Sequence, residues 1–133
     1  APSFVQRAAL EALRRETEIT PPLVAHFKLC RDTLVPLLEA LPNVQVKVPK
    51  GGMYAFFKIE GFDDSLRLAK RLVSEAGLGL APGSAFDLAP DTSTNRAGEG
   101  WMRWCFASKD VARLTLGVDR LGFWLKKSIK NLI

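Results

Sequence analysis

The fold of this chain depends on the stretch Gly100-Trp101-Met102-Arg103-Trp104-Cys105-Phe106-Ala107. Its apolar side chains alternate with a period of two, which is the spacing of a strand with one buried face. Met102, Trp104 and Phe106 therefore point into the expected core. Arg103 points the other way, where its charge requires a carboxylate, a phosphate or water. A structural ion pair is the plainer interpretation, and a guanidinium that grips a ligand carboxylate through two hydrogen bonds is the alternative.

The composition indicates one globular domain. The chain has 133 residues, 47% of them hydrophobic, which is enough for one core and short for two. No apolar run reaches the length of a membrane span, and the N-terminus lacks the features of a signal peptide, so we expect a cytoplasmic protein. The net charge of +5 owes three of its charges to Lys126, Lys127 and Lys130 near the C-terminus. Such charges commonly complement a helix end, so we do not expect nucleic acid as the partner.

The cysteines and the histidine give no sign of a metal site. Cys30 and Cys105 lie in apolar periodic segments without metal-ligand spacing, and we expect both to be buried thiols. His26 lies in a helical stretch, with no cluster of His, Cys or acidic residues near it in sequence. We therefore expect no zinc.

Two helices are predicted before the first strand. Ser3 is the expected cap of a helix that runs to about Glu16. Thr20 followed by Pro21 predicts the start of a second helix, which ends near Pro42. Pro36 interrupts that helix and should kink it or end it one residue earlier.

Strands and two further helices follow. Residues 44–48 and 53–59 predict an antiparallel hairpin around Gly51-Gly52. Asp64 or Ser65 should cap a helix that ends at Gly77. The apolar side of that helix is predicted to contain Leu66, Ala69, Leu72, Val73 and Ala76.

The remaining elements complete an α+β fold. Residues 78–81 predict a short strand, and residues 84–99 form a long polar loop that leads to the strand of Arg103. Ser108 is the expected cap of a final helix, in which Gly117 and Gly122 permit close approach to the sheet. Its packed side is predicted to contain Val111, Leu114, Val118, Leu121, Leu125 and Ile129. The order ααββαββα predicts a small, mainly antiparallel sheet covered by helices, in a single domain of residues 1–133.

Three segments together resemble a known family. They read Val48-Pro49-Lys50-Gly51-Gly52-Met53-Tyr54-Ala55-Phe56, then Glu75-Ala76-Gly77-Leu78-Gly79-Leu80-Ala81-Pro82-Gly83-Ser84-Ala85-Phe86, then the strand of Arg103. In this order they resemble the C-terminal small domain of class I/II pyridoxal-phosphate-dependent aminotransferases, which have the aspartate aminotransferase fold. Residues 5–13 look like the helix downstream of that family's cofactor lysine. The resemblance implies that residues 1–42 join a large domain and that residues 43–133 form the α+β core.

The resemblance also implies a substrate site. Arg103 matches the arginine that binds the α-carboxylate shared by the amino acid and the 2-oxo acid, so one clamp can orient both half-reactions. Tyr54 matches an aromatic position that lines the substrate side of the cleft. An aromatic ring that simply packs between strands is the alternative for Tyr54.

Departures from the family limit what this chain should do alone. Asp87 replaces a glycine of the Pro-Gly-Ser motif, and the loop before Arg103 is longer than in the resembled pattern. None of the nine lysines lies in the family's serine-rich context for the Schiff base, so we expect no catalytic residue and no pyridoxal phosphate bound by this chain alone. The implied partners are an N-terminal large domain and a second copy in a homodimer.

A different class of function stays open. Lys50-Gly51 followed by Tyr54 and Phe56 superficially resembles the aromatic strand of RNA-recognition modules, although Gly52-Met53 intervenes. A basic RNA-binding domain or a standalone regulatory interaction domain is therefore the alternative. The absence of an initiator methionine before Ala1 favours an excised piece over the standalone domain.

Overall fold

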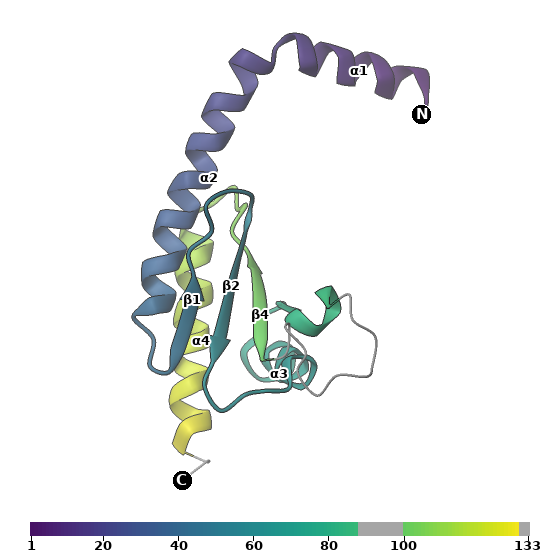
Figure 1. The fold of residues 1–133 in the computed structure, drawn as a ribbon. Helices are drawn as coiled ribbons and strands as arrows, with labels where there is room; N and C mark the ends of the chain where they lie inside the picture. Colours follow the sequence, from purple (N-terminus) through teal and green to yellow (C-terminus); the bar gives the residue numbers. More distant parts are fainter. Residues whose placement is uncertain (88–99, 131–133) are drawn as a thin grey trace.

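The computed structural model describes residues 1–87 and 100–130, with side chains as far as Ser128. Figure 1 shows the helices and strands in the predicted order ααββαββα. The helices are α1 (Ser3–Arg14), α2 (Glu16–Glu39), α3 (Ser65–Arg71) and α4 (Ala112–Lys130). The strands are β1 (Val44–Lys47), β2 (Tyr54–Ile59), β3 (Ala81–Pro82) and β4 (Trp101–Cys105). A π-helical turn, η1 (Leu72–Ala76), extends α3, and a 3-10 turn, η2 (Gly83–Phe86), follows β3. The predicted α+β fold class is confirmed.

The four strands form one antiparallel sheet in the order β1-β2-β4-β3. The predicted hairpin is confirmed, with Val44 opposite Ile59. β2 and β4 are central, and Phe56 of β2 lies opposite Arg103 of β4. The strand of Arg103 therefore has a partner on each side, which fixes the direction of its alternating side chains.

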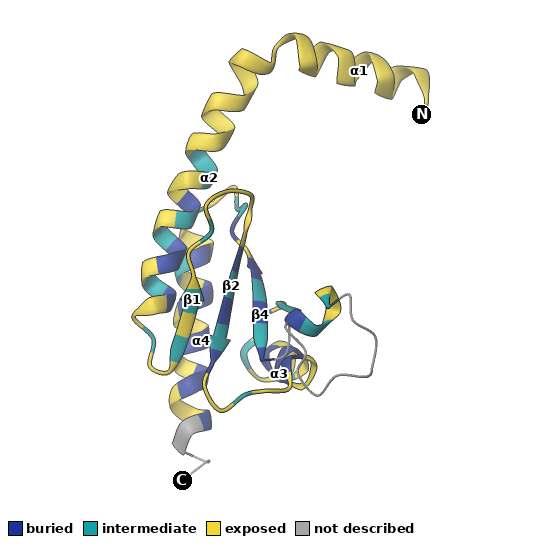
Figure 2. Ribbon diagram, viewed as in Figure 1, coloured by how far each residue is buried: buried dark blue, intermediate teal, exposed yellow. Residues whose placement is uncertain are grey.

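One face of the sheet carries the core. α2 and α4 pack together and α4 passes behind the sheet in Figure 1, while the buried residues in Figure 2 gather in the lower half of α2, in α4 and in the sheet. The side chains that the strands contribute to this face are Ala55, Phe57, Ile59, Met102 and Trp104, all buried. Met102, Trp104 and Phe106 thus lie in the core as the period-two pattern predicted.

α1 and the upper half of α2 lie apart from this core. α1 has no buried residue, and Phe4 and Leu13 are each 73% exposed (Figure 2). Ser3 is wrongly predicted as a side-chain cap, since the residue before the helix is Pro2 and no side-chain cap forms. Phe4 and Leu13 belong to an amphipathic helix whose apolar side is left exposed by the described residues.

α2 is longer than predicted. It begins at Glu16 and not at Thr20, and it continues through Pro21 and Pro36 to Glu39, so the expected end before Pro36 is wrong. Each proline removes a helical hydrogen bond. Because both prolines are exposed, water can solvate the carbonyl groups left without that bond.

α3 confirms its predicted ends but not its predicted face. The Asp64 carboxylate accepts the Arg67 amide at 2.8 Å, and Gly77 ends the segment with a φ of +63°. Leu66 and Val73 are 50% and 57% exposed, so their placement on the apolar side is wrong. For Val73 the reason is the π-helical turn, which has more residues per turn than an α-helix, so an apolar spacing of three and four residues does not hold across it. Leu66 lies before this turn, where Leu68 and not Leu66 faces the core. The buried apolar residues are Leu68, Ala69 and Leu72.

α4 starts later than predicted and contacts the sheet closely. Asp110, and not Ser108, caps it, since the Asp110 carboxylate accepts the Ala112 amide at 2.9 Å. At Gly117 an added Cβ would lie 2.7 Å from Cζ2 of Trp104, which confirms the predicted close approach to the sheet. The predicted apolar side is buried at Leu114, Val118, Leu121 and Leu125, while the side chain of Ile129 lies outside the description.

The remaining differences concern short segments. The strand predicted at residues 78–81 is only Ala81–Pro82, because pairing with β4 is limited to these residues. Cys30 is buried as predicted, but Cys105 is exposed, since it alternates onto the face opposite Met102 and Trp104. Most of the predicted loop 84–99 lies outside the described residues. Within the described part, no helix combines the length and apolar content that a bilayer crossing requires.

A polar network joins η1 to α4 at the edge of the core. The Arg71 guanidinium forms two hydrogen bonds with the Glu75 carboxylate, at 2.9 and 3.0 Å. The Trp124 indole N–H donates to the same carboxylate at 2.7 Å. Arg71 and Trp124 together lower the pKa of Glu75 to about 2. This carboxylate is thus anchored by one partner on its own helix and one on α4.

Candidate functional site

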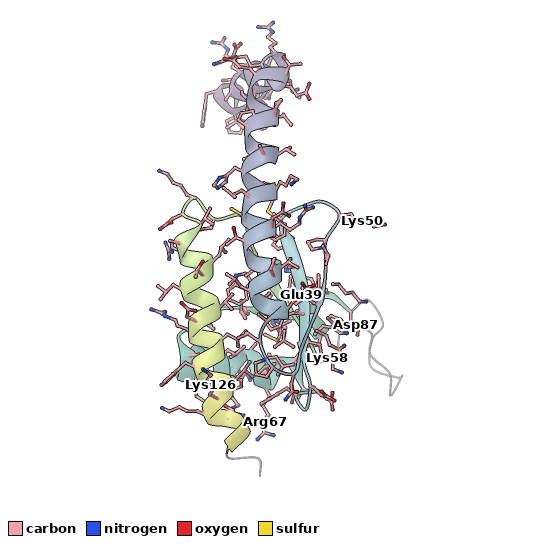
Figure 3. All side chains as sticks on the ribbon, turned by 90° about the vertical axis from the view of Figure 1, so that its left-hand side faces the viewer. Glu39, Lys50, Lys58, Arg67, Asp87 and Lys126 are labelled. Carbon is pink, nitrogen blue, oxygen red and sulfur yellow. The ribbon has the colours of Figure 1, made fainter. Side chains whose placement is uncertain are left out.

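The face of the sheet opposite the core carries the candidate site. Strand pairing places four residues in one row across it: Lys47 of β1, Phe56 of β2, Arg103 of β4 and Ala81 of β3. Directly paired residues point to the same side of a sheet. In Figure 3 the labelled Lys58 of β2 and Asp87 project on the side away from Lys126 of α4. Arg103 therefore stands in the middle of a face that α2 and α4 do not cover.

Arg103 is held between two aromatic rings. Its Cζ atom lies 4.1 Å from the ring centroid of Tyr54 and 3.9 Å from that of Phe86. Both rings therefore contact the guanidinium group at the same time. Such contacts contribute about 0.5–2 kcal/mol each, depending on desolvation. Two aromatic rings thus restrict the guanidinium, whose N–H groups are all hydrogen-bond donors.

The N–H donors of Arg103 have no acceptor in residues 1–87 and 100–130. Within these ranges the guanidinium makes neither a hydrogen bond nor a salt bridge, whereas the exposed Arg15 and the half-buried Arg71 make both. The structural ion pair that was the plainer interpretation of Arg103 is therefore not formed with any residue that the structure describes. A half-buried guanidinium with fixed orientation is suited to a planar, bidentate anion such as a carboxylate.

A cavity of about 380 Å³ opens beside Arg103. Tyr54, Phe56 and Phe86 line it. Tyr54 and Phe86 carry the two rings that contact Arg103, and Phe56 is the cross-strand neighbour of Arg103. Phe56 and Phe86 meet edge to face at 6.2 Å between centroids. On the far side, Lys47 places its ammonium 4.7 Å from the ring centroid of Trp101. The remaining wall consists of Val48, Pro49, Gly83 and Asp87.

Sequence reasoning found two residues of this site and missed the others. Arg103 and Tyr54, which were predicted as substrate-binding residues, do lie together. Phe56 lies two residues after Tyr54 in β2, so the alternation of the strand predicts that both side chains lie on the same face. Phe86 could not be placed, because the turn η2 folds it back over β4 and no local pattern predicts that contact. Asp87, noted as a departure, lies in the cavity wall.

The described residues do not fit pyridoxal phosphate by themselves. A Schiff-base lysine has to stand in an enclosed, water-poor site. Among the lysine side chains that the structure describes, all are exposed except Lys58, which is half-buried and pairs with Asp63 at 3.2 Å. No catalytic step through the cofactor can therefore be derived from this chain alone.

The described residues also contain no cluster of three or more His, Cys, Asp or Glu side chains arranged to hold a metal ion. His26 has a different role. Its Nε2 lies 2.7 Å from the carbonyl oxygen of Ser108, so that nitrogen donates to a backbone acceptor. The contact ties α2 to the connection between β4 and α4.

The sequence matches the family profile of aminotransferase class I and II over residues 1–121. This chain belongs to the class I and II aminotransferases. It is 34% identical over 119 residues to the aspartate aminotransferase of Thermotoga maritima, an overlap that covers 90% of this chain and 27% of that protein. Enzymes of this family use pyridoxal phosphate in their full-length form.

Solved aminotransferase structures share the fold. The aromatic aminotransferase from Pyrococcus horikoshii superposes with a TM-score of 0.80 and 26% identity, covering 98% of this chain and 33% of that one. An archaeal alanine:glyoxylate aminotransferase gives a TM-score of 0.78 at 27% identity, covering 96% of this chain and 31% of that one. The chain thus spans about a quarter to a third of the length of the aminotransferases it matches.

Proposed function

We propose that this chain is the C-terminal, arginine-bearing domain of a pyridoxal-phosphate-dependent aminotransferase, in which Arg103 binds the α-carboxylate of the substrate. One observation carries the proposal: the guanidinium lies against the rings of Tyr54 and Phe86, and its N–H donors have no acceptor among residues 1–87 and 100–128. Family membership supplies the reaction, which is amino-group transfer between an amino acid and a 2-oxo acid.

The role of Arg103 is to bind and orient. The amino acid and the 2-oxo acid share the carboxylate, so a bidentate guanidinium can hold both in one position. Tyr54 and Phe86 restrict rotation of the guanidinium and shield it from water, which strengthens its hydrogen bonds to the carboxylate. Tyr54 thereby acts as a wall of the site and as a support for Arg103.

The chemistry at the amino group needs residues beyond those of this chain. We infer that a large domain supplies the Schiff-base lysine, the phosphate cradle and the acid that holds the cofactor's pyridine nitrogen, and that residues 1–133 do not transaminate alone. The exposed apolar side chains of α1, including Phe4 and Leu13, are suited to dock that large domain. In the same proposal residues 1–42 join the large domain, residues 43–133 form the α+β core, the complete enzyme is a homodimer, and its location is cytoplasmic.

The RNA-binding alternative receives no comparable support. Tyr54 and Phe56 do share an open face, as base stacking requires. However, the ring of Tyr54 lies against Arg103 at 4.1 Å, so one of the surfaces that bases would need is occupied. Steeply salt-dependent RNA binding by the chain would favour the alternative. A standalone regulatory domain would instead require that no large domain complements this chain.

The test is amino-group transfer by the complete aminotransferase that contains residues 1–133. Replacing Arg103→Ala should lower kcat/KM by the equivalent of about 2–5 kcal/mol, the cost of removing one partner of a hydrogen-bonded charge pair. Arg113→Ala is the matched control, because Arg113 is exposed on α4 behind the sheet. An equal kcat/KM for the Arg103→Ala enzyme and the wild type would refute the proposed role. Turnover by residues 1–133 alone would refute the division of labour.

A further inference from the structure

The cavity beside Arg103 is built for a large apolar group. Four aromatic side chains surround it, Tyr54, Phe56, Phe86 and Trp101, and two further walls come from Val48 and Pro49. Its volume of about 380 Å³ lies within the range of small-molecule sites, roughly 300–1,000 Å³. Such a lining favours an aromatic group, because rings gain from edge-to-face and stacked contacts as well as from burial.

The cavity and the carboxylate clamp are parts of one site. Tyr54 and Phe86 are walls of the cavity and also hold the guanidinium of Arg103. Phe56 lies directly opposite Arg103 on the neighbouring strand, where paired side chains stand about 5 Å apart at Cβ. Arg103 itself does not line the cavity, so a ligand whose carboxylate is bound by Arg103 reaches the cavity across Phe56 and the two rings that contact the guanidinium.

The geometry points to a substrate class for this site: amino acids and 2-oxo acids with an aromatic side chain, whose ring enters the cavity formed by Phe56, Phe86 and Trp101. This inference rests on the proposed function, since it takes Arg103 as the carboxylate clamp. Phe56 is the floor that the ring packs on, and Trp101 and Phe86 are its side walls. None of these three residues was predicted from the sequence as part of a substrate site.

A dicarboxylate is the competing occupant, because Lys47 supplies a second cation at the far side of the cavity. Lys47 and Arg103 flank Phe56 in the same cross-strand row, two strand spacings or about 10 Å apart. However, Lys47 is exposed and its ammonium already lies over Trp101. An exposed ion pair adds at most about five-fold in affinity, whereas burying a phenyl group adds about ten-fold or more.

The experiment is a titration of the 133-residue chain with three probes, in which NMR chemical shifts report binding. The probes are propanoate, 3-phenylpropanoate and glutarate, which present a carboxylate alone, a carboxylate with a ring, and two carboxylates. We expect 3-phenylpropanoate to bind about ten-fold more tightly than propanoate. The ratio of the two Kd values should fall close to one in Trp101→Ala and in Phe56→Ala. Phe123→Ala is the matched control, since Phe123 is 65% exposed on α4 and should leave the ratio unchanged.

The outcomes separate this inference from the proposed function. If propanoate and 3-phenylpropanoate bind equally and Arg103→Gln abolishes both, the clamp stands and the aromatic site is overturned. If glutarate binds most tightly and loses its advantage in Lys47→Gln, the site is for dicarboxylates and the inference is again overturned. If no probe binds, or if Arg103→Gln changes none of the affinities, both the clamp and the aromatic site are wrong.

Discussion

The two faces of the sheet use the same strands for different purposes. In β4, Met102 and Trp104 point into the core and are nearly inaccessible to water, while Arg103 and Cys105 point to the open face. In β2, Phe57 is fully buried and its neighbour Phe56 lies beside the cavity. One face gains stability from close packing, and the other keeps aromatic and charged groups available to a ligand. The comparison teaches that a half-buried strand can satisfy the fold with every second residue and leave the rest free for function.

The largest expected effect compares the adjacent phenylalanines of β2. Phe57→Ala should destabilise the chain by about 3–5 kcal/mol, because it removes a fully buried ring from a packed core. Phe56→Ala should cost far less, about 1 kcal/mol, because Phe56 is half-buried and borders a cavity. Urea denaturation of both variants measures the difference. An equal loss of stability in the two variants would contradict the assignment of one sheet face to the core and the other to the site.

A smaller effect is expected where α4 meets the core face. Gly117→Ala would bring a Cβ within 2.7 Å of the buried Trp104 ring, and overpacking of this kind costs about 1–3 kcal/mol. Alanine regains up to about 1 kcal/mol of helix propensity, so we expect a net loss of stability of up to about 2 kcal/mol.

Gly122→Ala is the matched comparison on the same helix. Its added Cβ would meet only the tip of the Leu41 side chain at 3.0 Å, and that half-buried side chain can move. We expect unchanged or slightly increased stability. Denaturation midpoints that place Gly122→Ala below Gly117→Ala would contradict the assignment of Trp104 as the rigid contact.

The smallest effect concerns the polar edge of the core and depends on pH. The pKa of Glu75 is lowered to about 2 from an ordinary value of 4.5, chiefly by Arg71 and then by Trp124. A lowered pKa means that the carboxylate contributes to stability fully above pH 4.5 and loses that contribution as the pH falls toward about 2. Glu75→Gln should therefore be less stable than the wild type at neutral pH, and the gap should close in acid. Glu39→Gln, at an exposed site at the end of α2, is the matched control and should leave stability at neutral pH unchanged.

Local patterns predicted much of the fold because they reflect local physics. Alternation in β4 and β2 gave the correct buried residues, and Asp64 and Gly77 gave the correct ends of the helical segment between β2 and β3. The failures came from features without a local signature. Pro21 read as a helix start and Pro36 as a kink or an end, but α2 runs through both, because exposure lets water replace the missing bonds. The π-helical turn from Leu72 shifted the apolar face at Val73.

The site was predictable only in part, for a similar reason. Arg103 stood out because a charge interrupts an apolar strand, and the resemblance to aminotransferases added Tyr54. Phe86 and Trp101 contribute through contacts that arise only when η2 folds against β4 and Lys47 of β1 reaches across β2 to Trp101. Such contacts join residues distant in sequence, and no periodicity within one element encodes them.

The central claim is that β4 holds the fold with Met102 and binds a carboxylate with Arg103. The most direct measurement compares two single variants of this chain, Met102→Ala and Arg103→Gln. For each, it records the stability against urea and the affinity for propanoate. Met102→Ala should lose about 2–5 kcal/mol of stability, as expected for a buried methionine. Arg103→Gln should lose about 1 kcal/mol, from its ring contacts, together with all detectable binding. Unchanged propanoate affinity in Arg103→Gln, or a stability loss as large as that of Met102→Ala, would contradict the account.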